Sequence, residues 1–174
     1  MRNFLVLFLA LVLLTSCQTS NLAVDYEKEY SFSDVKTYSF STNNTIQLNQ
    51  IDSTNFMKNL ETELQAKGLI KNTNNPDVLI TLEVSGREDV QTRNVIGLGI
   101  GGGSGVGFGT GIGIPIRKKV IDYSIQVDFK DANTGTSVWI GKISNTQSYK
   151  ATGEAKDAFF KSNIQSLFKK YPPK

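Results

Sequence analysis

The 174-residue sequence contains no histidine and only one cysteine, Cys17. With one cysteine the chain cannot form an internal disulfide. Without histidine it cannot build the usual Cys/His zinc sites or a nucleophile activated by histidine. We therefore expect no metal and no cofactor, and a protein that is not an enzyme. Any catalysis would depend on carboxylate, Ser, Thr, Tyr or Lys side chains, which are common on protein surfaces.

Long apolar runs are also rare, and the clearest one lies at the N-terminus. Arg2 is followed by an almost unbroken apolar segment from Phe4 to Leu14, which is shorter than the roughly 20 residues that a membrane-spanning helix needs. A positive charge, a short apolar segment and small residues before a cleavage site are typical of a secretory signal. Such a signal explains the segment even if Cys17 is incidental.

The residues Leu14-Thr15-Ser16-Cys17 resemble the lipobox of bacterial lipoproteins. The resemblance implies that residues 1–16 are a signal peptide and that Cys17 carries a diacylglycerol on its thiol and an acyl chain such as palmitate on its new amine. Three acyl chains amount to a permanent membrane anchor. We expect residues 17–23 to be the lipidated N-terminus and a flexible tether.

The residues after the cysteine also bear on localisation. Gln18 to Asn21 have no aspartate in second place and no acidic run. By resemblance to lipoprotein sorting signals, this favours the inner leaflet of an outer membrane, facing the periplasm. The charge balance is small, with 19 Lys and Arg against 16 Asp and Glu, so we expect no nucleic-acid partner.

Residues 24–174 are predicted to form one α+β domain with a Gly-rich excursion at 94–116. Alternation of apolar and polar residues predicts strands at about 35–40, 78–93, 121–130 and 137–149. Apolar spacing of three and four residues predicts helices at 49–67 and about 160–171. The order strand, helix, three strands, helix predicts a four-stranded, largely antiparallel sheet with both helices on one face. A hairpin turn is expected at Asn133-Thr134-Gly135 and a bulge at Gly86.

Several short motifs occur in an order that resembles a known family. They are Asp25-Tyr26, the segment from Phe32 to Phe40, Lys67-Gly68-Leu69, Pro76-Asp77-Val78, Thr134-Gly135 with Val138-Trp139, and Tyr171-Pro172-Pro173. Together they resemble bacterial lipoproteins that carry domain of unknown function 4136, although Phe40 stands where that family usually has Trp. The resemblance implies a secreted, lipid-anchored α+β domain without an established activity, and it transfers no catalytic residue.

Glycine occupies every odd position from Gly97 to Gly113, and no charged residue occurs from Asn94 to Ile116. A phosphate-binding loop is disfavoured because no Gly-Lys-Ser/Thr follows and a strand, not a helix, comes next. A membrane-spanning helix is disfavoured by the glycine content. Two interpretations remain open: a surface excursion without a function, and a long hairpin that contacts a membrane or a partner. The candidate contact residues of the second are Leu98, Ile100, Val106, Phe108, Ile112, Arg93, Arg117, Lys118 and Lys119.

Other candidate sites have simpler interpretations. Asp122 and Asp128 share a strand face, but about 20 Å separates them, too far for paired acid–base catalysis. Trp139, with Tyr38 and Phe40, fits a core anchor better than a ligand groove. The sequence thus favours a lipid-anchored envelope lipoprotein that acts as a non-enzymatic binding or assembly module. The alternatives are a carboxylate-dependent enzyme on envelope polymers and an oligomeric pore subunit that uses the Gly-rich hairpin.

Overall fold

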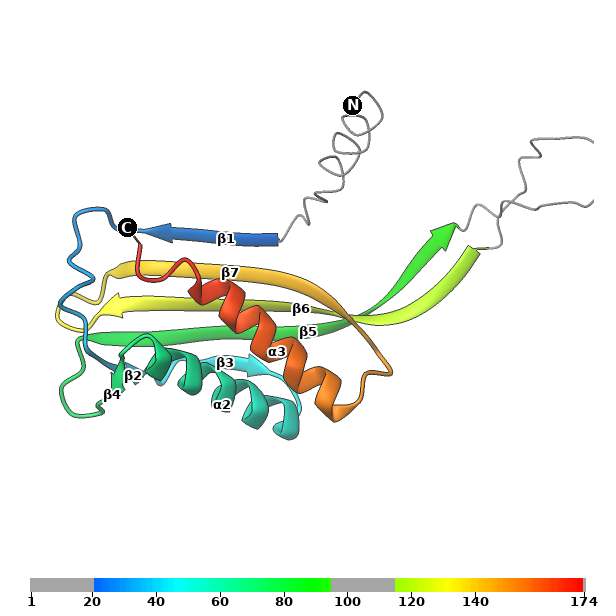
Figure 1. Cartoon of the computed structure of the whole chain (residues 1–174), viewed down its shortest axis with the longest axis horizontal. Helices are drawn as coiled ribbons and strands as arrows, with labels where there is room; N and C mark the ends of the chain where they lie inside the picture. The colour runs from blue at the N-terminus through cyan, green and yellow to red at the C-terminus, as the bar shows by residue number, and fades with distance from the viewer. Residues whose placement is uncertain (1–20, 95–114, 174) are drawn as a thin grey trace, which may run out of the picture.

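The computed structural model describes residues 21–94 and 115–173. Within these ranges, two helices pack on one face of a seven-stranded mixed sheet (Figure 1). The elements in chain order are β1 (Asn21–Tyr26), β2 (Thr37–Phe40), β3 (Thr45–Gln47), α2 (Gln50–Ala66), β4 (Ile70–Lys71), β5 (Val78–Asn94), β6 (Pro115–Asp131), β7 (Ser137–Ser148) and α3 (Gly153–Phe168). The strand order is β1-β7-β6-β5-β2-β4, and β3 also pairs with β5.

The antiparallel meander predicted for the last three strands is confirmed. β5 pairs with β6 from Val78↔Asp131 onward, and β6 pairs with β7. The turn between β6 and β7 contains Gly135 at φ +72°, a left-handed conformation that glycine adopts without strain. Alternating side chains along these strands therefore divide into a face under the helices and an opposite, uncovered face.

The prediction of a four-stranded, largely antiparallel sheet is wrong. β1, β3 and β4 enlarge the sheet, and β2 and β3 run parallel to β5. These strands span only two to six residues, so each is too short to produce a clear alternating pattern. β1 begins at Asn21, so residues 21–23, which the sequence assigns to the tether, are paired with β7.

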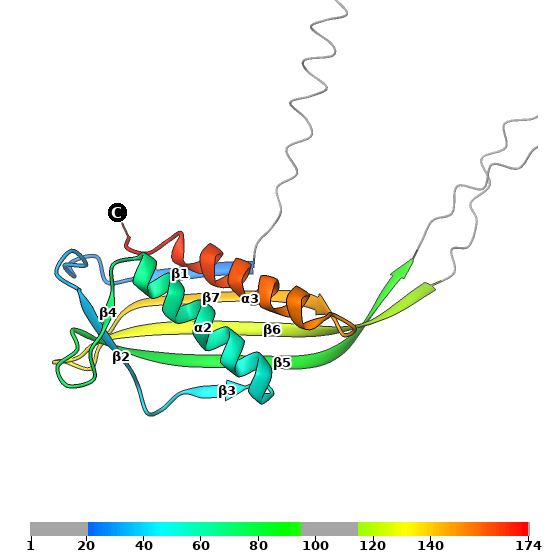
Figure 2. The ribbon, with the colours of Figure 1, turned by 60° about the horizontal axis from the view of Figure 1, so that its bottom comes forward.

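Helix α2 matches the predicted segment because its ends are marked by local chemistry. The Asn49 side chain accepts a hydrogen bond from the Asp52 backbone N–H at 2.9 Å, which caps the first turn. Gly68, at φ +81°, ends the helix as a left-handed residue. Both helices lie side by side across the sheet (Figure 2).

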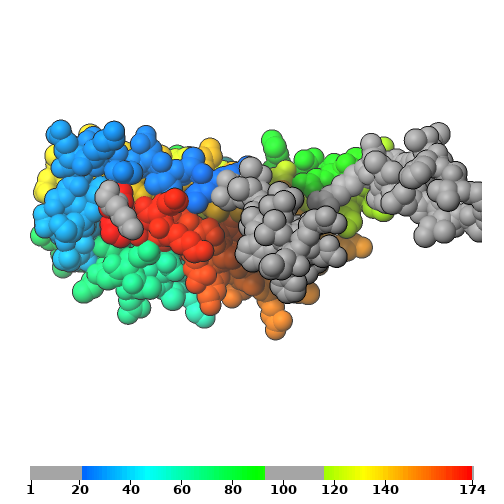
Figure 3. Space-filling view, turned by 45° about the horizontal axis from the view of Figure 1, so that its top comes forward, coloured from blue at the N-terminus to red at the C-terminus, as the bar shows by residue number. Residues whose placement is uncertain are grey.

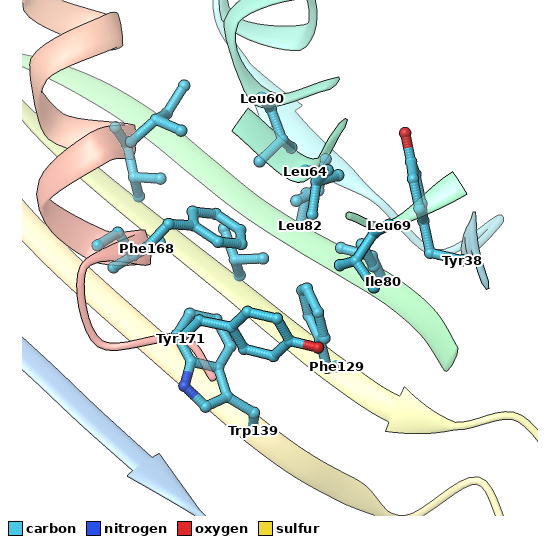
Figure 4. Packing of buried hydrophobic residues seen from close by; sticks show 14 of the residues in the cluster. Tyr38, Leu60, Leu64, Leu69, Ile80, Leu82, Phe129, Trp139, Phe168 and Tyr171 are labelled. Atoms are coloured by element: carbon cyan, nitrogen blue, oxygen red, sulfur yellow. The ribbon is translucent and has the colours of Figure 1, made fainter. Parts of the chain in front are cut away.

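The core lies between these helices and the sheet. As the apolar spacing predicts, Phe160, Ile164 and Phe168 of α3 are buried there. Trp139 is also fully buried, which confirms it as a core anchor, and its ring packs against Phe129 and Phe168 (Figure 4). The Tyr171 ring, just after α3, closes this aromatic cluster.

Gly86 does not form the predicted bulge. The β5–β6 register continues unbroken through Gly86↔Tyr123. A Cβ atom at position 86 would lie 2.8 Å from Cε1 of Tyr123, so glycine leaves room for that ring. Of the predicted Gly-rich excursion at 94–116, residues 95–114 lie outside the described residues.

Candidate functional site

Strands β5 and β6 continue to pair beyond the rest of the sheet. The last β6–β7 pair is Val120↔Ser148, whereas β5–β6 pairing extends from Val90↔Lys119 to Asn94↔Pro115. We call this two-stranded extension, residues 90–94 and 115–119, the ribbon. It projects from one end of the domain (Figures 1 and 3). Val90 and Ile116, on its two strands, are 49% and 47% exposed, so the ribbon presents apolar side chains to solvent.

Basic side chains lie on the β6 strand of the ribbon. Arg117, Lys118 and Lys119 are exposed. Lys119 Nζ is 5.5 Å from the centroid of the Tyr149 ring, a distance that fits a cation–π contact. Tyr149 also donates its backbone N–H to the Lys119 carbonyl at 3.2 Å, so the residue that follows β7 is held against the ribbon.

The start of β1 lies at the same end of the domain. Asn21 lines a hollow of about 480 Å³ together with Gln91, Lys118 and Lys119. A neighbouring hollow of about 530 Å³ is lined by Asn21, Arg87 and Asp122, among others. The first described residue of the chain is therefore placed beside the ribbon and its basic residues.

The uncovered face of the sheet is polar. One row of paired residues runs across four strands as Ser85, Ser124, Ser144 and Asn21. The neighbouring row places Glu83, Gln126 and Lys142 opposite one another. A polar face of this kind can stay in water or meet a polar partner, because antiparallel sheets tolerate one solvated face.

The acidic residues on this face have nearby partners of their own. Asp122 accepts a hydrogen bond from Thr146 Oγ1 at 2.6 Å. Asp128 is paired with the hydroxyl of Ser137, and its Oδ2 is 3.7 Å from Lys130 Nζ. Asp131, the last residue of β6, pairs with the buried Val78 and so belongs to the other face. It accepts the Thr134 backbone N–H at 2.8 Å, and this bond is the main reason its pKa is lowered.

Two other carboxylates, Asp25 and Glu27, border a shallow hollow of about 190 Å³ and are exposed. A carboxyl group that works as a general acid needs a site from which water is largely excluded. Across residues 21–94 and 115–173, no group of three or more His, Cys, Asp or Glu residues is arranged to hold a metal ion.

The predicted contact residues divide into two groups. Arg117, Lys118 and Lys119 lie on the ribbon, and Arg93 is paired with Ile116 in its backbone register. Cys17 and the residues Leu98, Ile100, Val106, Phe108 and Ile112 lie outside the described residues. No sequence pattern marks Val90, Ile116 and Tyr149 as candidate contact residues, because their exposure depends on where β7 stops pairing with β6.

Neither helix in the described part of the chain is both long enough and apolar enough to cross a membrane.

Comparison with solved structures shows a shared fold at low sequence identity. A PDZ domain protein from Parabacteroides distasonis aligns with 89% of this chain at 14% identity and a TM-score of 0.53. The alignment covers only 36% of that longer protein. The PelC dodecamer from Paraburkholderia phytofirmans aligns with 86% of this chain and 94% of its own, at 11% identity and a TM-score of 0.50.

A DUF4136 family protein from Bacteroides thetaiotaomicron aligns with 88% of this chain and 96% of its own, at 11% identity and a TM-score of 0.48. No curated protein matches the sequence. The family model described as domain of unknown function (DUF4136) matches residues 22–173. This match covers both described ranges almost completely and confirms the family that the sequence motifs resemble. The chain therefore belongs to the DUF4136 family.

Proposed function

We propose that the protein is a lipid-anchored lipoprotein of the cell envelope. In this proposal it acts as a non-enzymatic binding or assembly module at the periplasmic face of the outer membrane. The observation that carries the proposal is the start of β1 at Asn21, where pairing with β7 already begins. Only Gln18, Thr19 and Ser20 separate this paired strand from Cys17. An extended linker of this length reaches at most about 14 Å, so an acyl anchor at Cys17 holds the domain close to the bilayer.

The anchor is tested by replacing Cys17 with Ala and labelling growing cells with a radioactive fatty acid. We expect the Cys17→Ala chain to lose the label, because the thioether-linked glyceride requires the cysteine thiol. Ser16→Ala is the matched control, since it retains a small residue before the cleavage position and leaves Cys17 in place. Undiminished label in the Cys17→Ala chain contradicts the proposal.

The Gly-rich segment is included in this proposal as a contact region. Its residues Leu98, Ile100, Val106, Phe108 and Ile112, with Arg93, Arg117, Lys118 and Lys119, would meet a membrane or a protein partner. The support is the ribbon, since both of its strands lead into this segment and both carry exposed apolar side chains.

Self-assembly is a second candidate. It is favoured by the fold shared with a chain that forms the PelC dodecamer, 94% of which is covered by the alignment. The outer edge of β1 also pairs with no strand in residues 21–94 and 115–173, so it can accept another strand. The mass of the full-length chain in detergent, measured by light scattering, tests this candidate. A multimer supports it, and a monomer at all concentrations contradicts it.

A further inference from the structure

The end of the domain that carries the ribbon has an unusual surface composition. Four of the six large apolar side chains that are exposed in the described residues, Ile51 (72%), Val90 (49%), Ile116 (47%) and Tyr149 (44%), belong to elements at this end. The other two, Tyr26 and Ile70, lie toward the opposite end of the sheet. α2 begins at this end (Figures 1 and 2) and carries Ile51 in its first turn. Val90 and Ile116 lie on the ribbon. Tyr149 lies against Lys119 of the ribbon. Exposed apolar side chains gathered at one end of a domain indicate a contact surface.

Charged residues of both signs occur at this end of the domain, but the charged residues on the outer part of the ribbon are all basic. Arg87, Glu88, Asp89 and Asp122 lie nearer the domain body, where β6 still pairs with β7. Arg117, Lys118 and Lys119 lie farther out, opposite the uncharged residues Thr92, Gln91 and Val90. The outer part of the described ribbon is therefore cationic. Aromatic and basic side chains next to one another are typical of residues that sit at a membrane–water interface.

The position of the N-terminus fits the same surface. The hollow lined by Lys118 and Lys119 is also lined by Asn21, the first residue of β1. From Asn21, β1 runs toward the opposite end of the sheet, where Tyr26 pairs with Trp139 (Figure 1). A short tether before Asn21 thus approaches the domain at the end where the exposed apolar and basic residues gather.

From these observations we propose that this end of the domain docks on an anionic lipid surface. Lys118 and Lys119 bind phosphate headgroups, and Val90, Ile116 and Tyr149 enter the interfacial layer. The proposal rests on the acyl anchor at Cys17, and it adds a fixed orientation in which the ribbon faces the bilayer and the β6–β7 turn points away. Phosphate groups attract these side chains electrostatically, and the attraction is confined to about one Debye length from the surface.

The absence of a second cysteine makes this orientation measurable in the full-length chain. Once Cys17 is acylated, a single introduced cysteine is the only thiol available for a fluorophore. We choose Val90→Cys on the ribbon and Asn133→Cys in the β6–β7 turn as its matched control, because both positions are exposed. The length of β6 separates the two positions by about 40 Å. The labelled chains are reconstituted in phosphatidylcholine vesicles, with or without phosphatidylglycerol, that contain a lipid with a nitroxide quencher on its headgroup.

We expect the label at position 90 to be quenched in the vesicles with phosphatidylglycerol and the label at position 133 to stay unquenched. Lys118→Glu with Lys119→Glu is expected to abolish most of the quenching at position 90. Lys169→Glu with Lys170→Glu, the same charge change at the other end of α3, is expected to leave it unchanged. Salt at about 1 M, where the Debye length is about 3 Å, should also reduce the quenching.

Equal quenching at positions 90 and 133, or quenching at position 90 that is insensitive to phosphatidylglycerol and to the Lys118 and Lys119 changes, overturns the proposal. The mass of the reconstituted chain separates this failure from that of the proposed function. If the chain is acylated but shows no preferred orientation, only the docking proposal is overturned. If the chain carries no acyl groups, both the docking proposal and the proposed lipid anchor are overturned.

Discussion

Asp77 joins the start of β5 to the start of β2 through its carboxylate. Its Oδ2 atom accepts hydrogen bonds from the backbone N–H groups of Lys36 and Thr37 at 2.9 and 2.8 Å. The Thr37 hydroxyl donates a third bond at 2.8 Å. These bonds, led by the one from Lys36, hold the pKa of Asp77 below its ordinary value of 3.8. Asp77 and Thr37 both lie in motifs that carry the family resemblance, and the structure gives them a role in the fold.

Asp77→Asn is expected to lower the free energy of unfolding by about 1–3 kcal/mol at neutral pH, because the neutral amide is a weaker acceptor for these three donors. A lowered pKa in the folded state means that the stabilisation is complete above pH 3.8 and is lost as the pH falls through the folded-state pKa. Urea unfolding at a series of acidic pH values should therefore show a shallower loss of stability in the variant. Glu29→Gln, a change at an exposed position, is the control. If the unfolding free energy of Asp77→Asn depends on acidic pH in the same way as that of the parent, this prediction is contradicted.

Gly141 is required by the packing of the aromatic core. A Cβ atom at this position would lie 2.6 Å from Cη2 of Trp139 and 3.0 Å from Cδ1 of Leu167. Both neighbours are fully buried, so neither can move aside without disturbing others.

Gly141→Ala should therefore destabilise the domain by about 1–3 kcal/mol through overpacking. Thermal or urea unfolding measures the effect. Gly153→Ala is the matched control, because no atom lies within 4 Å of the added methyl group. If the two variants unfold together, the packing around Trp139 is looser than the structure indicates.

At the scale of elements, α3 contributes its apolar side to the core. The Phe168 ring contacts the rings of both Trp139 and Tyr171, with centroid distances of 5.6 and 6.0 Å. α3 also contacts α2 through Lys156, whose ammonium group donates to Asp52 Oδ2 at 2.9 Å. That bond raises the pKa of Lys156 and keeps it charged.

Phe168→Ala is expected to cost about 3–5 kcal/mol, because the cavity would lie inside the aromatic cluster. Lys161→Ala, an exposed change on the same helix, should cost little. Unfolding in urea distinguishes the two variants. An unchanged midpoint for Phe168→Ala would show that this side of α3 is not part of the core.

At the scale of the whole molecule, the ribbon is a projection that the core does not require. Within the described chain, its residues from Val90 to Asn94 pair only with residues 115–119. The buried part of β5 ends at Val84, so the packed residues lie elsewhere.

Replacing residues 94–115 by Asn-Gly keeps Arg93 opposite Ile116 in the existing register and supplies a favourable hairpin turn. We expect this deletion to leave the urea midpoint nearly unchanged, since every core residue of the described ranges is retained. In a chain that begins at Ser20 and so lacks the lipid anchor at Cys17, we also expect the deletion to reduce binding to anionic vesicles. In the full-length chain we expect it to dissociate any oligomer that is present in detergent. If folding, vesicle binding and oligomeric state all remain as in the parent, the Gly-rich segment is a surface excursion and its proposed contact role is wrong.

The sequence by itself determined the features that depend on local chemistry. Asn49 and Gly68 bound α2, and the alternation in β5 and β6 specified the faces of two long strands. The spacing of Phe160, Ile164 and Phe168 specified the core side of α3. Each of these signals is contained in a few neighbouring residues, so no knowledge of the fold is needed to read it.

Tertiary structure alone decided the rest. β1, β3 and β4 are too short to be recognised, and they become strands because β7, β5 and β2 offer them open edges. Gly86 and Gly141 depend on rings that approach from Tyr123 and Trp139. The proximity of Asn21 to Lys118 and Lys119 joins segments far apart in the chain. Strand pairing and packing create these relations, and a linear pattern does not encode which edges will meet.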